Sequence, residues 1–180
     1  SVETVTAQPG QTVQLTVSLT DNPGLCGLYF GIDYDHSKLT LEDYSCPNES
    51  FAQGDWMVGV GQEERAVWLQ PDLTEAEGEI LTLTFRVASD AGTGDIAVSL
   101  TDITGVDDRA NSVRIAGNAG GVTVALGLPG DINGDGKVSS ADLLRLRRYL
   151  AGQAVTAETG NADLNSDGRV DLQDLMLLQI

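Results

Sequence analysis

Two twelve-residue stretches near the C-terminal end carry the same order of oxygen-bearing side chains. Residues 131–142 read Asp-Ile-Asn-Gly-Asp-Gly-Lys-Val-Ser-Ser-Ala-Asp, and residues 163–174 read Asp-Leu-Asn-Ser-Asp-Gly-Arg-Val-Asp-Leu-Gln-Asp. Ca²⁺ takes about six to eight oxygen ligands, which a loop of this length supplies from about six positions, with glycine at its sixth residue for the sharp turn. Both stretches fit that order, so the sequence predicts two calcium ions in EF-hand-like loops.

Each predicted site consists of side-chain oxygens and one backbone carbonyl. The first comprises Asp131, Asn133, Asp135, the carbonyl of Lys137, Ser139 and Asp142. The second comprises Asp163, Asn165, Asp167, the carbonyl of Arg169, Asp171 and Asp174. Both loops end in Asp rather than the usual Glu, and the shorter carboxylate can bind bidentately if the following helix lies nearer the ion. Such residues also form metal-free turns, but two matching loops favour calcium.

Each loop runs into an apolar stretch with helical spacing. The first stretch contains Leu143, Leu144, Leu146, Tyr149 and Leu150. The second contains Leu175, Met176, Leu177 and Leu178. A repeated unit of this size cannot bury its apolar face alone, so the two should pack together. We therefore expect a small all-α module over residues 131–180 with two loop–helix repeats.

Residues 1–126 have a different sequence pattern, with short segments of alternating apolar and polar residues separated by Gly, Asp, Asn and Pro. Apolar side chains alternate with polar ones in residues 12–19 and 27–34, which is the period of a half-buried strand. Similar segments follow at residues 66–70, 79–87, 96–100 and 121–125. The pattern predicts an all-β jelly-roll sandwich of about nine strands over residues 1–126, with residues 127–130 as a short linker.

Charge and composition exclude several classes of protein. The 180 residues carry a net charge of −17, and residues 1–126 contain 19 acidic and 5 basic side chains. Nucleic-acid binding needs basic patches, so this chain is not expected to bind one. No apolar run is long enough to span a membrane, and no signal region is present, so any secretion leader would have been removed.

The sequence offers little that could perform catalysis. Its one histidine, His36, lies in a Tyr-Asp-His-Ser-Lys corner where a turn role is favoured, and no nucleophile elbow, phosphate loop or zinc-helix motif is present. We therefore expect no enzyme activity.

Cys26 and Cys46 are the only cysteines, and their spacing leaves both a disulfide and two separate thiols open.

Paired Asp-x-Asn-x-Asp-Gly-x-Val loops that end in Asp, without an entering helix, resemble the dockerin module of cellulosome-type assemblies over residues 130–180. The N-terminal segment resembles a cohesin, the receptor of dockerins, through its strand order, its Tyr34-Asp35 corner, a GEILTLTFRV strand at residues 78–87 and a closing GGVTV at residues 120–124. The resemblance implies a non-catalytic scaffoldin adaptor that binds a dockerin-bearing protein through residues 1–126 and a cohesin-bearing scaffold through residues 131–180. It further implies an extracellular, bacterial surface-associated complex that degrades polysaccharide.

The resemblance also implies where partners bind. Cohesins dock through one sheet face, and strand alternation assigns to that face Tyr29, Gly31, Asp33, Trp68 and Gln70. Dockerins dock through the tenth and eleventh loop residues and the helix that follows, here Ser140, Ala141, Arg145, Arg147, Arg148, Leu172 and Gln173. These residues differ between the repeats, which predicts one binding orientation. The basic helix and the acidic sandwich also make self-association conceivable but less favoured.

The main alternative is carbohydrate binding by the β-sandwich. Jelly rolls often present a row of aromatic side chains to sugar rings, and Trp56, Trp68, Tyr29 and Tyr44 could supply one. Only 5% of the residues are aromatic, which argues against a long platform. Ordinary half-buried positions for Trp68 and Tyr29, and a solvated helix face for the arginines, also remain open.

Overall fold

The chain forms two compact units, which we describe from a computed structural model covering residues 1–59, 64–155 and 159–178. The first unit spans Ser1–Ala125 and the second spans Leu126–Ile180. No described helix has the length and apolar character needed to cross a membrane.

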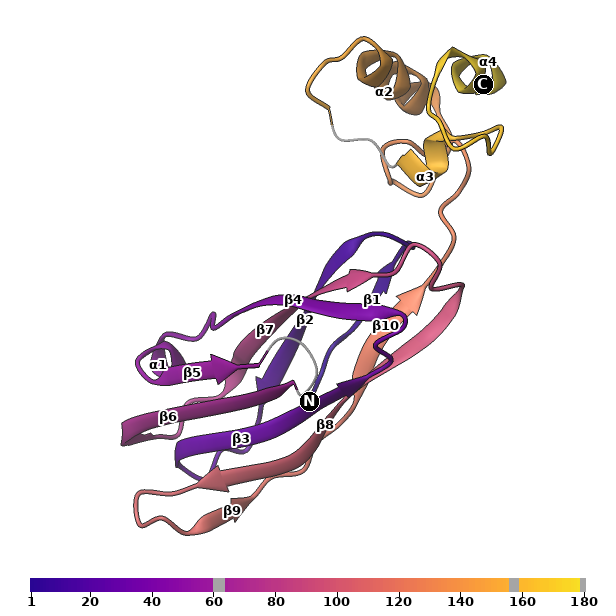
Figure 1. Ribbon diagram of the computed structural model, residues 1–180. Helices are drawn as coiled ribbons and strands as arrows, with labels where there is room; N and C mark the ends of the chain where they lie inside the picture. Colours follow the sequence, from indigo (N-terminus) through magenta and orange to yellow (C-terminus); the bar gives the residue numbers. More distant parts are fainter. Residues whose placement is uncertain (60–63, 156–158, 179–180) are drawn as a thin grey trace. The chain divides into compact units, whose positions relative to one another are not determined.

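The first unit is a sandwich of two sheets (Figure 1). The larger sheet has the strand order β1-β10-β8-β3-β6-β5, with β9 paired to β8, and the smaller has the order β2-β7-β4. The strands of the larger sheet are β1 (Thr4–Ala7), β3 (Leu25–Tyr34), β5 (Asp55–Val58), β6 (Arg65–Thr74), β8 (Gly94–Val106), β9 (Ser112–Arg114) and β10 (Gly120–Val124). Those of the smaller sheet are β2 (Thr12–Leu19), β4 (Leu39–Ser45) and β7 (Gly78–Val87).

This architecture confirms the predicted jelly-roll class, with ten strands among the described residues where about nine were expected. The six segments chosen by alternation all fall on strands, because each turns one apolar face toward the other sheet. Four further strands were not predicted. Strands β1, β5 and β9 are four residues or shorter, too short to show a period, and β4 has seven residues but loses its alternation after Leu41, where the exposed Glu42 and Asp43 are adjacent. A one-turn helix, α1 (Glu49–Ala52), follows β4 and buries Phe51.

The core of the first unit lies between the two sheets. Its members come from both sheets, and the largest fully buried side chains among them are Trp68, Phe30, Phe51, Phe85, Leu15, Leu25, Leu39, Leu41, Leu81 and Leu83. Aromatic rings meet inside it: Phe51 lies 4.7 Å from Trp68, and Tyr34 lies 4.9 Å edge-on to Phe85, between ring centroids. Burial of this apolar surface is the main stabilisation of the fold.

The second unit contains the helices α2 (Ser140–Leu150), α3 (Thr159–Ala162) and α4 (Leu172–Leu177). Its core is small and joins the two repeats through Ile132, Leu146, Ala162 and Leu178. Both α2 and α4 begin with a capping box, in which the cap side chain and the third helical residue satisfy backbone N–H groups reciprocally. So small a core needs additional stabilisation of the kind that a bound metal supplies.

Candidate calcium loops and docking surfaces

In the first loop, the carboxylate of Asp131 organises the turn. It is 4% exposed, and its oxygens accept hydrogen bonds from the backbone N–H groups of Gly134 at 2.8 Å, Asp135 at 3.1 Å and Gly136 at 2.8 Å. Gly136 has a φ of 82°, a left-handed conformation that favours glycine. The glycine at the sixth position therefore has the conformational role that the sequence predicted.

The last residue of the loop, Asp142, is fully buried and closes the loop against α2. One of its oxygens accepts the N–H groups of Ile132 at 2.9 Å and Asn133 at 3.0 Å. The other accepts the N–H of Ser139 at 2.8 Å and its hydroxyl at 3.1 Å. Burial alone would raise the pKa of Asp142, but the hydrogen bonds from Asn133, Ser139 and Ile132 outweigh it and hold the pKa below its usual value. The carboxylate is thus kept ionised.

The second loop repeats this construction. Asp163 accepts the N–H groups of Asp167 at 3.2 Å and Gly168 at 2.9 Å. Asp174 is fully buried and accepts the N–H groups of Leu164 at 2.8 Å, Asn165 at 3.3 Å and Asp171 at 2.8 Å. Burial opposes ionisation here too, and the hydrogen bonds again lower the pKa of Asp174. The two loops agree in geometry as well as in sequence.

The donor set of both loops suits a hard cation. Every predicted ligand is a carboxylate, amide, hydroxyl or carbonyl oxygen, which calcium prefers to nitrogen or sulfur. Within the described residues no three Asp, Glu, His or Cys side chains converge as a metal cluster. Loop side chains bond one another instead: the Asn133 amide nitrogen donates to Asp135 at 3.0 Å, and that of Asn165 donates to Asp167 at 2.9 Å. The residues fit calcium by type and order.

The second unit also exposes large apolar side chains on the helices that follow the loops. Leu144 on α2 is 49% exposed, and on α4 Leu172 and Met176 are 67% and 73% exposed. Six of the seven docking residues predicted for this unit are exposed: Ser140, Ala141, Arg147, Arg148, Leu172 and Gln173. Arg145 is half-buried and has an interaction within the protein. Sequence reasoning assigned Leu144 and Met176 to the apolar stretches without separating the outer from the inner face.

In the first unit, β3 turns the predicted residues Tyr29, Gly31 and Asp33 to the outer face of the larger sheet, since the alternate residues of β3 are buried. The prediction for Trp68 was wrong. Trp68 is fully buried, and its indole N–H donates to the carbonyl of Phe51 at 2.9 Å. Strand β6 has the opposite phase to the one assumed, because Ala66 and Trp68, not Val67 and Leu69, face the core.

The corrected phase defines an apolar stripe on the outer face of the larger sheet, which we call the stripe: Met57, Val67, Leu69 and Tyr29. Met57 is 70% and Leu69 60% exposed, and Met57 pairs with Val67, which in turn pairs with Tyr29, across three adjacent strands. Gln70, also predicted for this face, is half-buried, and its amide donates to the carbonyl of Asp72. Large exposed apolar residues that adjoin one another typically mark an interaction site.

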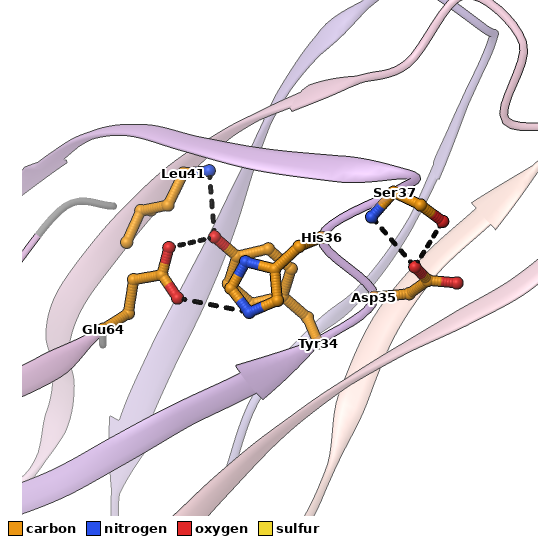
Figure 2. A network of polar contacts seen from close by, with 6 residues as sticks. All are labelled: Tyr34, Asp35, His36, Ser37, Leu41 and Glu64. Atoms are coloured by element: carbon orange, nitrogen blue, oxygen red, sulfur yellow. Dashed lines mark hydrogen bonds and ion pairs between the residues drawn. The ribbon is translucent and has the colours of Figure 1, made fainter. Parts of the chain in front are cut away.

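The corner after β3 contains a polar network that the sequence did not predict (Figure 2). The Tyr34 hydroxyl donates to the carboxylate of Glu64 at 2.5 Å and accepts the N–H of Leu41 at 3.3 Å. The other Glu64 oxygen lies 3.6 Å from Nε2 of His36, whose ring stacks on Tyr34 at 4.3 Å. Glu64 is only 5% exposed. The spacing of Tyr34 and His36 is too common a pattern to predict that both contact Glu64.

Two of the alternatives that the sequence left open, the pairing of the cysteines and the row of aromatic side chains, are decided by the positions of these residues. Cys26 and Cys46 are free thiols, near the carbonyls of Val106 and Asn48 respectively. The aromatic row considered for sugar binding does not form, because Trp68 is buried and Trp56 packs against Phe30 and Trp68 on the inner side of the sheet. Tyr29 is the one member of that set on the stripe.

A two-sheet sandwich joined to paired oxygen-rich loops defines a modular binding protein. A family model described as "Cohesin domain" matches residues 1–124, and one described as "Dockerin type I domain" matches residues 129–179. The chain belongs to the cohesin family and carries a dockerin type I domain after its cohesin. Dockerin type I domains bind calcium, and both modules are non-catalytic interaction modules of extracellular assemblies. No curated protein matches the chain.

Solved structures with the same fold include cohesins from bacteria and an archaeon. The solution structure of CaCohA2 from Clostridium acetobutylicum is 22% identical with a TM-score of 0.60, and the match covers 72% of this chain and 91% of that one. A non-cellulosomal cohesin from Archaeoglobus fulgidus is 18% identical with a TM-score of 0.59, covering 69% and 88%. A crystal structure of CaCohA2 in complex with a dockerin variant is 23% identical with a TM-score of 0.61, covering 69% and 96%. These likenesses establish the fold of the first unit.

Proposed function

We propose that this protein is a non-catalytic adaptor of a cellulosome-type assembly. Its cohesin receives the dockerin of one protein, and its own dockerin attaches to the cohesin of a scaffold. The observation that supports this most directly is that each unit exposes apolar side chains over its regular elements, on β5 and β6 in the first unit and on α2 and α4 in the second. One chain with two separate binding faces can join two partners.

The dockerin-binding face of the first unit is the outer surface of β8, β3, β6 and β5, centred on the stripe. Its energetic centre consists of Met57, Leu69 and Tyr29, because binding energy concentrates in large apolar and aromatic residues that become fully desolvated. Gly31 and Asp33 continue this face along β3. Trp68 supports the face from beneath and does not contact the partner.

The cohesin-binding face of the second unit is formed by the exposed sides of α2 and α4. Two calcium ions, one in each loop, hold these helices in place through the twelve predicted ligands. The two helices are chemically unequal, since α2 presents Arg147 and Arg148 near Leu144 while α4 presents Leu172 and Met176. The partner therefore binds in one orientation. We place the functional modules at residues 1–126 and 131–180.

The assembly acts outside the cell, attached to a bacterial surface, where the partner enzymes degrade polysaccharide. The proposal is tested by isothermal titration of the full chain with recombinant cohesins and dockerins from the source organism. The expected result is at least one dockerin and one cohesin that bind independently, the cohesin only in calcium. Failure of every dockerin and every cohesin to bind would contradict the proposal, and retardation on cellulose or xylan gels would favour sugar binding.

A further inference from the structure

One buried polar side chain of the second unit is not a predicted calcium ligand. Among the described residues of this unit, the buried polar or charged side chains are Asp131, Asp142, Asn161 and Asp174. Three of them are ligands in the proposed calcium loops, and the fourth, Asn161, is 4% exposed on the short helix α3. Burying an amide is costly unless its polar atoms are hydrogen-bonded, so the partners of Asn161 indicate what it holds.

Asn161 bonds the first residue of the other repeat's loop. Its side-chain nitrogen donates to the carbonyl of Asp131 at 2.9 Å, and its own backbone carbonyl accepts the N–H of Gly130 at 2.8 Å. Asn161 also lies two residues before Asp163, which opens the second loop. One residue therefore joins the first predicted ligands of both loops, Asp131 through hydrogen bonds and Asp163 through the chain.

The surroundings of Asn161 keep this connection in place. Gly127 packs against it without a side chain, and a Cβ atom at residue 127 would overlap the side-chain oxygen of Asn161. Ile132 and Ala162, the chain neighbours of Asp131 and Asn161, are both fully buried in the core of the unit. The entrance to the first loop therefore cannot shift without displacing Asn161 or opening this core.

The other contacts of the loops do not provide an equivalent connection. In each loop, the hydrogen bonds of the first and last carboxylates, given above, stay within that loop. Within the described chain, Val138 and Val170, at matching positions of the two loops, belong to no strand or β-bridge. Main-chain pairing of these valines therefore does not connect the loops, and Asn161 supplies a polar link between the repeats.

We infer that Asn161 couples the two calcium loops, so that filling either loop helps to order the other. The inference rests on the calcium binding of the proposed function. When Asp163 holds an ion, the chain at Asn161 is fixed, and the hydrogen bonds of Asn161 then fix Asp131 before the first loop is filled. The loop filled second loses less conformational freedom, which raises its affinity, and the coupling acts equally in both directions. Asn161 is thus a positioning residue that touches no ion itself.

Calorimetry of calcium binding to the full chain tests the coupling through variants that disable one loop at a time. Asp135→Ala disables the first loop and Asp167→Ala the second. Both are predicted ligands at matching positions, and both are exposed, so their removal leaves the buried bonds of Asn161 in place. With Asn161 present, we expect disabling either loop to weaken calcium binding at the other by roughly ten-fold. With Asn161→Ala, disabling one loop should change the affinity of the other by less than roughly two-fold.

A second variant perturbs the same contact from the opposite side. Gly127→Ala keeps the amide but forces the Asn161 side chain away from its position, so it should also reduce the coupling. The matched control is Gln153→Ala, which removes an exposed amide from the same unit and should leave the coupling of the native chain unchanged. Helical circular dichroism in saturating calcium shows whether each variant folds.

Several results would overturn the coupling. One is an Asn161→Ala chain that binds calcium more weakly at both loops but keeps the coupling of the native chain, because Asn161 would then only stabilise the unit. Variants at Asn161 and Gly127 that stay unfolded in saturating calcium would overturn it for the same reason, as would a native chain without coupling. Each leaves the proposed function intact if the native chain still binds a cohesin only in calcium. Absence of calcium binding by the native chain would overturn the calcium dependence in the proposed function, and the coupling with it.

Discussion

Replacing Tyr34 with Phe should destabilise the cohesin without altering its outer surface. The Tyr34 hydroxyl donates to the buried carboxylate of Glu64 at 2.5 Å and also accepts the N–H of Leu41. The phenyl ring would keep its contacts with Phe85 and His36. A hydrogen bond to a charged group contributes about 1.5–3 kcal/mol, and its removal leaves a buried acceptor unsatisfied. We therefore expect the free energy of unfolding to fall by about 2–3 kcal/mol.

Urea denaturation followed by tryptophan fluorescence measures this loss, since both Trp56 and Trp68 lie in or against the core. The matched control is Tyr44→Phe, because among the described residues the Tyr44 hydroxyl has no hydrogen-bond partner. Adding Glu64→Leu to Tyr34→Phe should recover part of the stability, since removing both polar partners is far less costly than orphaning one. A loss for Tyr34→Phe no larger than for Tyr44→Phe would refute the role assigned to this network.

Three further predictions concern Tyr34, the phase of strand β6 and the calcium loops. Burial and, after it, the hydrogen bond to Glu64 raise the pKa of Tyr34 above its ordinary value of 10.0. The contribution of Tyr34 to stability is therefore complete below about pH 10 and is lost as the pH rises further. Urea denaturation at rising pH should show this loss in the native chain and a smaller one in Tyr34→Phe. Trp68→Ala should lower the free energy of unfolding by about 3–5 kcal/mol. Met57→Asp should change it by less than about 0.5 kcal/mol and abolish dockerin binding. Equal losses of stability would mean that the inward and outward residues of β6 have been assigned the wrong way round. Chelation should remove the helical circular dichroism of residues 131–178 while the first unit keeps its thermal transition. The buried carboxylates of Asp142 and Asp174 would then lose the cation that neutralises their charge. An unchanged helical signal would count against metal-coupled folding.

The calcium loops were predictable from sequence because their function depends on local order. The proposed ligands and the glycine lie within twelve consecutive residues, so spacing alone is enough to select them. The structure adds what spacing cannot show: the carboxylates of Asp131 and Asp142 accept hydrogen bonds from backbone N–H groups of their own loop. The jelly roll was predictable for the related reason that most of the long strands keep a stretch of two-residue alternation.

The docking face was predicted only in part, because it depends on contacts between distant segments. Strand β3 has a clear period, and its outward residues were identified correctly. Strand β6 begins Arg-Ala-Val-Trp-Leu-Gln, in which four consecutive apolar residues place apolar side chains on both faces, so the pattern does not indicate which face is buried. Trp68 faces inward because α1 supplies Phe51 as a partner, a contact that no local pattern reveals. Glu64 and Tyr34 are thirty residues apart, so their pairing was equally hidden.

The central claim is that one chain joins two partners through independent faces, and a three-component mixture tests it most directly. Light scattering with size-exclusion chromatography would be applied, in calcium throughout, to the full chain with a cognate dockerin protein and a cognate cohesin protein. The account predicts a single complex containing one copy of each. With Asp142→Ala and Asp174→Ala in the chain's own loops, it predicts that the dockerin protein stays bound and the cohesin protein separates. Two partners that exclude each other on the native chain, or a loop variant that loses the dockerin protein as well, would contradict it.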